Sequence, residues 1–199
     1  MTAAAILAGG RATRLDERDK SSLAFGSERL LDRQVAALRR VADHVFIVSS
    51  RHERQAAGDL PVVADAFPGG GVLGGLYTAL QASPAPQTLV VACDLPFLTT
   101  TFLRHLAETG RDADIAIPRS ADGYQPLCAS YSRTCLPVIR RQLDDGRLKV
   151  VDLLQQGLRV REIGPDDLAR FDPEGWLFFN VNTLEDYARA LNKLSRQNR

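Results

Sequence analysis

The alternation of short aliphatic runs with amphipathic segments is the feature that most limits what this chain can fold into. Four runs are short, mostly apolar and bounded by turn or helix signals, as the central strands of a parallel sheet are: 4–8, 45–49, 88–93 and 114–117. Between them lie segments whose apolar residues repeat at helical spacing, such as Leu31, Val35 and Leu38. This rhythm predicts an α/β fold with one doubly wound, mostly parallel sheet, right-handed crossovers and helices on both faces.

Further elements are expected between and after these runs. We predict strands over 61–64, 124–131, 158–163 and 176–181, and a chain of 199 residues fits a single domain. Thr99, Ser132 and Thr183 stand just before helical patterns and are expected to cap them. Asp186, three residues after Thr183, makes a variant of the capping box at the C-terminal helix.

Charge and cysteine usage narrow the class of protein. Lysine and arginine total 25 and aspartate and glutamate 24, so the formal net charge is +1, which argues against a nucleic-acid binder. The three cysteines suggest neither a disulfide framework nor a zinc site, which favours reduced thiols in a cytoplasmic protein. The apolar start has no basic region, and no apolar run is long enough to cross a membrane. We therefore expect neither nucleic acid nor membrane among its partners.

The segment after the first strand has the character of a phosphate-binding loop. Gly9 and Gly10 let the backbone turn sharply, so that its N–H groups can point at a phosphate. Arg14 and Lys20 follow and could neutralise a nucleoside triphosphate. The spacing fits neither the P-loop nor the dinucleotide-binding fingerprint, which disfavours a P-loop kinase and a dinucleotide dehydrogenase. Considered by itself, the segment could also be a Gly-Gly turn with solvated charges.

Two further segments carry candidate metal ligands. Asp94 follows the run 88–93, and a carboxylate at the tip of a buried strand needs a partner such as Mg²⁺. Asn180 and Asn182 are two apart in the predicted last strand, so period-two alternation would place both amides on one face. Their amide oxygens could ligate Mg²⁺ or hold a phosphate-bearing ligand. Each also has a plain structural alternative, since Asp94 could cap the turn before Pro96 and Asn182 could help to cap the C-terminal helix.

Several segments form an ordered set that spans nearly the whole chain: Leu7-Ala8-Gly9-Gly10 with Arg14 and Asp19-Lys20, Gly70 to Gly75, Cys93-Asp94-Leu95-Pro96-Phe97, Asp122 to Leu127, and Phe179-Asn180-Val181-Asn182-Thr183. In this order and spacing they resemble the nucleotidyltransferases of the sugar-nucleotide pyrophosphorylase type, and most closely the molybdenum cofactor guanylyltransferase family. The resemblance implies a Rossmann-like nucleotidyltransferase fold. It also implies a Mg²⁺-dependent enzyme that moves GMP from GTP onto the phosphate of molybdopterin and releases pyrophosphate.

The resemblance implies roles for particular residues. Those expected to contact the nucleotide are Leu7, Ala8, Gly9, Gly10, Lys20, Asp65, Gly74 and Asp94. Arg14 and Lys20 are expected to stabilise the triphosphate and the leaving pyrophosphate. Asp94 and Asn182 are expected to hold Mg²⁺, with Asn180 and Asn182 near the acceptor.

The resemblance also implies that two parts of the single domain 1–199 bind different substrates. The part up to about residue 117 would bind GTP, and the part from about 118 would bind molybdopterin and complete the metal site. A glycine-rich loop of the family corresponds to Gly71–Gly75. Partners would be GTP, molybdopterin and, transiently, proteins that make or receive the cofactor.

The chain departs from the family pattern at three places. Asp16 stands where glycine is usual, and Val48 lies near the place of an asparagine that contacts the nucleotide. The segment Gly69-Gly70-Gly71 is richer in glycine than the family's loop. A related enzyme using CTP, or one acting on a sugar 1-phosphate, is the nearest alternative. Gly9 favours GTP because the cytidylyl branch tends to have alanine there. Asp65 is consistent with guanine, whose N1–H and N2–H₂ a carboxylate can accept, whereas cytosine offers its exocyclic amine alone.

A non-catalytic nucleotide-binding module on the same fold is the alternative from a different class, because fold does not fix function. Arg14, Lys20 and Asp94 occur together, which favours the enzyme.

Overall fold

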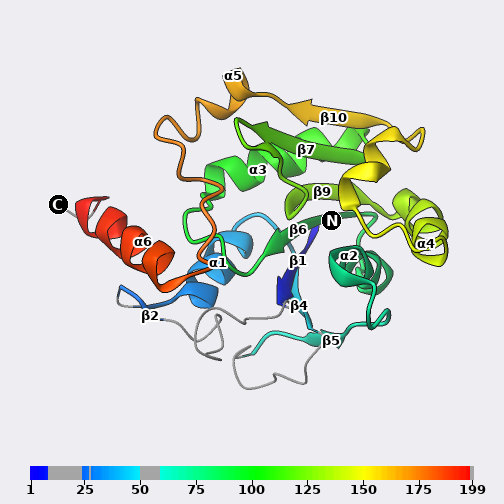
Figure 1. The fold of residues 1–199 in the computed structure, drawn as a ribbon, viewed down its shortest axis with the longest axis horizontal. Helices are drawn as coiled ribbons and strands as arrows, with labels where there is room; N and C mark the ends of the chain where they lie inside the picture. The colour runs from blue at the N-terminus through cyan, green and yellow to red at the C-terminus, as the bar shows by residue number, and fades with distance from the viewer. Residues whose placement is uncertain (9–23, 27, 50–58, 198–199) are drawn as a thin grey trace.

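The computed structural model describes residues 1–8, 24–26, 28–49 and 59–197. Through them runs a sheet of order β10-β7-β9-β6-β1-β4-β5, with β8 paired to β7 (Figure 1). Its strands are β1 (Ala3–Ala8), β4 (His44–Ser49), β5 (Val62–Ala64), β6 (Gln87–Ala92), β7 (Ile115–Ser120), β8 (Gly123–Tyr124), β9 (Cys128–Ser132) and β10 (Val160–Ile163). A separate hairpin joins β2 (Ala24–Phe25) to β3 (Glu28–Arg29).

The sheet is mostly parallel, as predicted. β1 lies between β4 and β6 and runs parallel to both, and the pairs β4–β5 and β7–β10 are parallel as well. β9 runs antiparallel between β6 and β7. The predicted runs 4–8, 45–49, 88–93 and 114–117 correspond to β1, β4, β6 and β7. Their residues are almost wholly buried because helices cover both faces.

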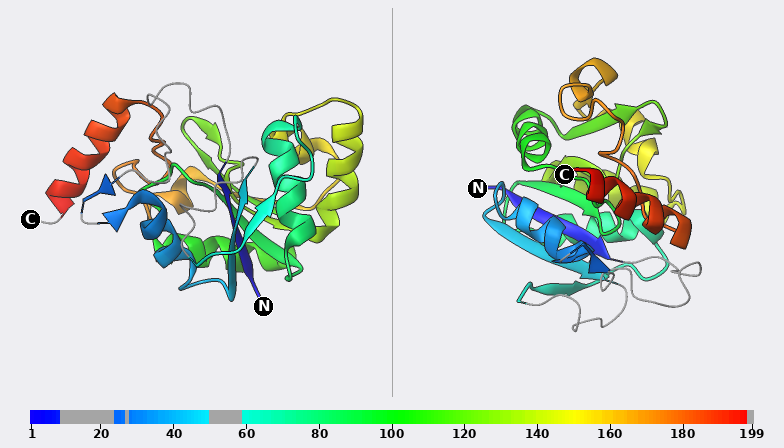
Figure 2. Two further views of the ribbon diagram at one scale, coloured as in Figure 1. Left: turned by 90° about the horizontal axis from the view of Figure 1, so that it is seen from below. Right: turned by 90° about the vertical axis from the view of Figure 1, so that its left-hand side faces the viewer.

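The helices divide between the two faces of the sheet. They are α1 (Leu30–Leu38), α2 (Gly71–Ala82), α3 (Thr100–Thr109), α4 (Leu136–Asp144), α5 (Pro165–Leu168) and α6 (Leu184–Gln197), with 3-10 turns η2 (Gly110–Asp112), η3 (Arg133–Cys135) and η4 (Val150–Gln155). Ala4 and Ile6 of β1 join the core beneath α1 and α3, whereas Ala5 and Leu7 join the core beneath α2 and α4. Figure 2 shows the two helix pairs on opposite sides of the sheet. The predicted double winding is confirmed.

A third, smaller core holds the C-terminal helix in place. Leu194 and Ala190 of α6 pack with Phe25 of the β2–β3 hairpin, and with Phe97 and Val181. α6 projects at one side of the molecule next to the hairpin (Figure 1). This core therefore ties the end of the chain to the segment that follows β6.

The strand predicted over 176–181 is wrong. The segment consists of turns. Backbone N–H groups at its start bond to a side chain instead of a neighbouring strand, and its apolar side chains pack into the cores. Asp172 accepts hydrogen bonds from the backbone N–H groups of Trp176 and Leu177, at 2.6 and 2.8 Å. The ring of Trp176 lies 5.3 Å from that of Phe97, edge to face. The aromatic residues here pack into two of the cores instead of forming strand faces, Phe178 into the core beneath α1 and α3, and Trp176 and Phe179 into the third core.

Two other expectations need correction. The strand predicted over 124–131 is split into β8 and β9, because Pro126 interrupts it and Gln125 N–H turns back to the carbonyl of Pro118 at 2.9 Å. The glycine-rich segment Gly71–Gly75 is not a loop but the beginning of α2.

The predicted caps at Thr99 and Thr183 are confirmed. Ser132 caps the 3-10 turn η3 and not α4, whose N-cap is Cys135. Thr99 Oγ1 accepts from Phe102 N–H at the start of α3, and Ser132 Oγ accepts from Thr134 N–H in the 3-10 turn that leads into α4. Thr183 and Asp186 exchange reciprocal bonds of 3.0 and 3.1 Å at the start of α6. Among the described residues, no helix has the length and apolar character that a membrane crossing requires.

Candidate functional site

The carboxyl ends of four strands meet at one edge of the sheet. Leu7 is in register with Val48 and Ala92, and Ser49 with Ala64, so β1, β4, β5 and β6 end together. In open α/β sheets, ligands bind beyond this edge. The segments that leave it include those that carry Asp65 and Asp94.

Asp94 lies two residues beyond the end of β6. Cys93 N–H still donates to the carbonyl of Leu7 at 3.3 Å, and the chain then leaves the sheet. Asp94 is partly exposed, with Oδ1 buried. Its backbone carbonyl accepts a hydrogen bond of 3.0 Å from Val181 N–H. The structure thus brings the segment 180–182 next to Asp94, although they are far apart in the sequence.

Asn180 and Asn182 flank Val181 in this segment. Val181 is buried in the third core, whereas both asparagines are exposed. The amide of Asn180 donates to the carbonyl of Phe178 at 3.2 Å. The premise of a shared strand face is wrong, because no strand forms here. Both asparagines nevertheless adjoin Val181, whose N–H donates to the carbonyl of Asp94.

The backbone of Asn182 is fixed by the capping box of α6. Its N–H donates to Asp186 Oδ2 at 3.1 Å. Burial acts to raise the pKa of Asp186, but the hydroxyl of Thr183, the N–H groups of Asn182 and Thr183, and the charge of Arg189 together lower it. The carboxylate form therefore holds the turn that carries Asn182.

Asp65 is anchored to α2. Its Oδ1 accepts from Phe67 N–H at 2.9 Å and lies 3.0 Å from the hydroxyl of Thr78, which is itself 2.9 Å from the carbonyl of Gly74. Asp65 N–H donates to the carbonyl of Ser49 at 3.1 Å. This turn and the first turns of α2 therefore form one unit.

Gly74 has a steric reason to be glycine. A Cβ atom there would lie 2.8 Å from the carbonyl oxygen of Phe67. The close approach of α2 to the Asp65 turn thus requires a residue without a side chain.

The loop after β1 lies mainly outside the described residues. Gly9, Gly10, Arg14 and Lys20 fall there, as does Asp16. Leu7 and Ala8 end β1, and the side chain of Leu7 packs in the core beneath α2.

Within the described residues, no group of three or more histidine, cysteine, aspartate or glutamate side chains could hold a metal ion. A metal at Asp94 could complete its shell with amide or phosphate oxygens. Those are hard oxygen ligands of the kind that Mg²⁺ prefers, and Asn182 could provide one.

Two residues near the site were not predicted from the sequence. Gln34 on α1 donates hydrogen bonds to the carbonyls on either side of Asp94, and Thr78 holds Asp65. Gln34 lies on the same helical face as Leu31, Val35 and Leu38. A polar residue on this otherwise apolar face could have indicated that Gln34 has a specific partner.

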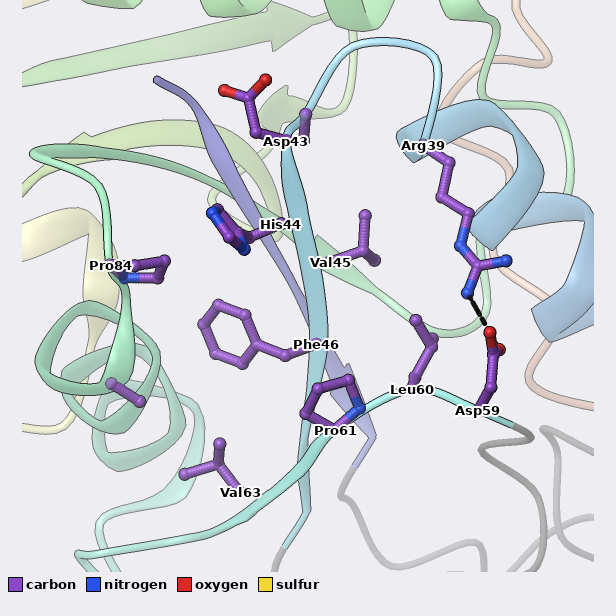
Figure 3. Close-up of a pocket in the computed structure, with 12 residues that line it drawn as sticks. Arg39, Asp43, His44, Val45, Phe46, Asp59, Leu60, Pro61, Val63 and Pro84 are labelled. Carbon is purple, nitrogen blue, oxygen red and sulfur yellow. Dashed lines mark hydrogen bonds and ion pairs between the residues drawn. The ribbon is translucent and has the colours of Figure 1, made fainter.

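A cavity of about 670 Å³ lies at the opposite end of the sheet (Figure 3). His44 and Phe46 at the start of β4 line it, and an ion pair of 2.8 Å between Arg39 and Asp59 crosses one side. None of the candidate residues that the structure describes lines this cavity. Because ligands of such folds bind at the carboxyl edge, we place the candidate site at Asp65 and Asp94 instead.

Comparisons with known proteins identify the family to which this chain belongs. Residues 4–160 match the MobA-like NTP transferase domain. A protein of Pelotomaculum thermopropionicum named "Probable molybdenum cofactor guanylyltransferase" is 35% identical over 185 residues, covering 93% of this chain and 89% of that protein.

Solved structures share the fold. Molybdopterin-guanine dinucleotide biosynthesis protein A from Archaeoglobus fulgidus superposes with a TM-score of 0.82 at 27% identity, over 98% of this chain and 99% of that one. A protein of Mycobacterium tuberculosis H37Rv, solved as a complex with manganese, has a TM-score of 0.67 at 24% identity, over 96% of this chain and 97% of that one. The latter likeness concerns the fold alone.

Proposed function

The chain belongs to the family of MobA-like NTP transferase domains and is a nucleotidyltransferase, and we propose that it transfers GMP from GTP to the phosphate of molybdopterin. The observation that carries the proposal is the hydrogen bond from Val181 N–H to the carbonyl of Asp94. It joins an acid and two asparagines at the edge of the sheet where nucleotides bind. The named relatives supply the acceptor.

The proposed reaction is an in-line displacement at phosphorus. An oxygen of the acceptor phosphate forms a bond to the α-phosphorus of GTP, and the bond from that phosphorus to the bridging oxygen of the β-phosphate breaks. Pyrophosphate leaves with the bonding electron pair. The attacking phosphate is already ionised, so the protein need not remove a proton. Catalysis is then mainly positioning and neutralisation of charge.

Asp94 and Asn182 would hold Mg²⁺, whose charge would offset that of the phosphates. Asp94 suits this role because it is partly exposed at the sheet edge, and Asn182 because the capping box fixes its backbone. Asn180 and Asn182 would face the acceptor. Arg14 and Lys20 would neutralise the triphosphate, and the backbone of Gly9 and Gly10 would cradle it.

Asp65 would read the guanine base together with the start of α2 at Gly74. Its Oδ1 is engaged by Phe67 N–H and Thr78, which leaves Oδ2 to accept from the base. Guanine presents N–H donors that such an acceptor can discriminate. The sheet edge at Asp65 and Asp94 would therefore hold GTP, and the part from about residue 118 would supply the acceptor side through the segment 180–182.

The test is pyrophosphate release with each of the four nucleoside triphosphates, with and without molybdopterin. We expect release with GTP and Mg²⁺ that depends on molybdopterin. Equal turnover with CTP would contradict the assignment of the base, and binding of GTP without any turnover would favour the non-catalytic module. We place the reaction in the cytoplasm, a compartment in which the thiols of Cys93, Cys128 and Cys135 would stay reduced.

A further inference from the structure

Gln34 is a buried polar residue on the apolar face of α1. Its side chain is 2% exposed, and Leu31 and Leu38 of the same helical stripe are 1% and 0% exposed. Burying an amide costs free energy unless its hydrogen bonds are made, so the bonds of Gln34 indicate what it is for.

Both N–H groups of the Gln34 amide donate to the turn that carries Asp94. Nε2 lies 2.8 Å from the carbonyl oxygen of Ala92 and 3.1 Å from that of Leu95. Ala92 is the last residue of β6, and Leu95 follows Asp94. One side chain therefore spans Cys93 and Asp94 and fixes the backbone before and after them.

Two more hydrogen bonds hold the same turn. Arg33 Nε, from the neighbouring position on α1, donates to the carbonyl of Pro96 at 3.0 Å. Val181 N–H donates to the carbonyl of Asp94 from the other side. α1 and the segment before α6 thus both hold the turn. The two hydrogen bonds of Gln34 are buried, whereas that of Arg33 is part-buried.

Burying the amide of Gln34 costs free energy that its hydrogen bonds offset only in part. Its Oε1 is buried and has no hydrogen-bond partner among the described residues. Gln142 on α4 shows the same state: it is 0% exposed, its Oε1 is likewise buried without a partner, and its Nε2 donates to the carbonyl of Lys149 at 2.7 Å. The two residues differ in what they hold, since Lys149 lies just before η4 and is not part of the Asp94 turn.

We propose that Gln34 is a positioning residue that orients the Asp94 carboxylate toward the metal by clamping the carbonyls of Ala92 and Leu95. This inference rests on the proposed function, because it takes Asp94 as the metal ligand. Outer partners of ligating groups set their orientation, and losing one typically lowers metal affinity by about ten- to a hundredfold. Gln34→Met keeps the length and apolar contacts of the side chain but removes both donors.

The test compares Gln34→Met with Gln142→Met in the full-length protein. Mn²⁺ is titrated against each variant loaded with a non-hydrolysable α,β-methylene analogue of GTP, and free Mn²⁺ is read by electron paramagnetic resonance. We expect the Kd for Mn²⁺ to rise about tenfold in Gln34→Met and to stay at the wild-type value in Gln142→Met. Thermal melts should show that both variants lose stability. Binding of the analogue without metal should be unchanged in both.

The outcomes separate this inference from the proposed function. Equal Mn²⁺ affinity in Gln34→Met and Gln142→Met, with Asp94→Asn clearly weakened, would overturn the role of Gln34 and leave Asp94 in place. Wild-type affinity in Asp94→Asn would overturn the metal assignment and this inference with it. If Gln34→Met does not fold, Gln34→Leu takes its place, since it also removes both donors and has a high helix propensity. We expect the same rise of about tenfold there, and no rise would overturn the clamp.

Discussion

At Asp94, charge and shape can be separated experimentally. Asp94→Asn keeps the size of the side chain and leaves the backbone bond from Val181 in place. It removes the negative charge that would hold Mg²⁺ against the triphosphate. We expect the rate of pyrophosphate release to fall by on the order of a hundredfold or more and the Mg²⁺ requirement to rise. A Mg²⁺ titration of wild type and variant measures both effects.

Thermal melts provide the folding control for this variant. An Asp94→Asn protein that melts like wild type and keeps its rate and metal dependence would show that Asp94 only caps the turn.

The hydroxyl of Thr78 offers a second test at the scale of one residue. Thr78 is 2% exposed, and its Oγ1 lies 3.0 Å from Asp65 Oδ1 and accepts from Ala66 N–H at 3.0 Å. Thr78→Val keeps the branched shape but removes these bonds, which should lower stability by about 1–2 kcal/mol. Because Asp65 would then be less well oriented, we expect the KM for GTP to rise about three- to tenfold with kcat near the wild-type value.

Initial rates over a range of GTP concentrations separate the two constants. A loss in kcat at unchanged KM would show that the Asp65 turn does not serve binding of the base.

At the scale of elements, Asp114 joins the start of β7 to two neighbouring segments. Its Oδ2 accepts from Arg159 N–H at 2.8 Å, just before β10, and its Oδ1 accepts from the hydroxyl of Thr134 in η3 at 2.8 Å. The backbone N–H of Arg159, then its side chain, the Thr134 hydroxyl and the Arg159 charge lower the pKa of Asp114 below its ordinary value of 3.8, against the opposing effect of burial.

This shift predicts how stability depends on pH. A pKa that is lower in the folded state means that the carboxylate stabilises the fold above the ordinary pKa, and that this contribution is lost as pH falls through the folded value. Asp114→Asn should therefore lower the free energy of unfolding by about 1–2 kcal/mol at neutral pH. The difference from wild type should shrink as the pH is lowered from about 5 toward 3. Urea unfolding at a series of pH values measures it, and a difference independent of pH would contradict the assignment.

Over the whole molecule, the sheet was predictable because its central strands are buried on both faces and read as continuous apolar runs. Asp94 could be placed at a strand tip for the same reason. The segment 176–181 could not be predicted correctly, because its run of aromatic and aliphatic residues resembles a strand and nothing local reveals that Asp172 accepts hydrogen bonds from its backbone. The prediction that Asn180 and Asn182 lie at the site was based on a strand that does not form. The tertiary bond from Val181 to Asp94 brings that segment there instead.

The long-range nature of this link leads to a last prediction about the third core. Leu194 of α6 is 7% exposed and packs with Val181 and Phe97, whose segments flank Asp94. Leu153 in η4 is 0% exposed and packs in the core beneath α2 and α4. Either residue changed to Ala leaves a cavity and should lower the free energy of unfolding by about 2–4 kcal/mol.

The two variants should differ in function because only the cavity left by Leu194→Ala lies next to the segments that carry Asp94 and Asn182. In Leu194→Ala, α6 loses part of its anchor, so the turn that carries Asn182 should hold its position less well against Asp94. We expect a Mg²⁺ requirement about three- to tenfold higher in Leu194→Ala and unchanged in Leu153→Ala, with both assayed well below their melting temperatures. Equal metal requirements in the two variants would show that α6 stabilises the fold without setting the geometry of the site.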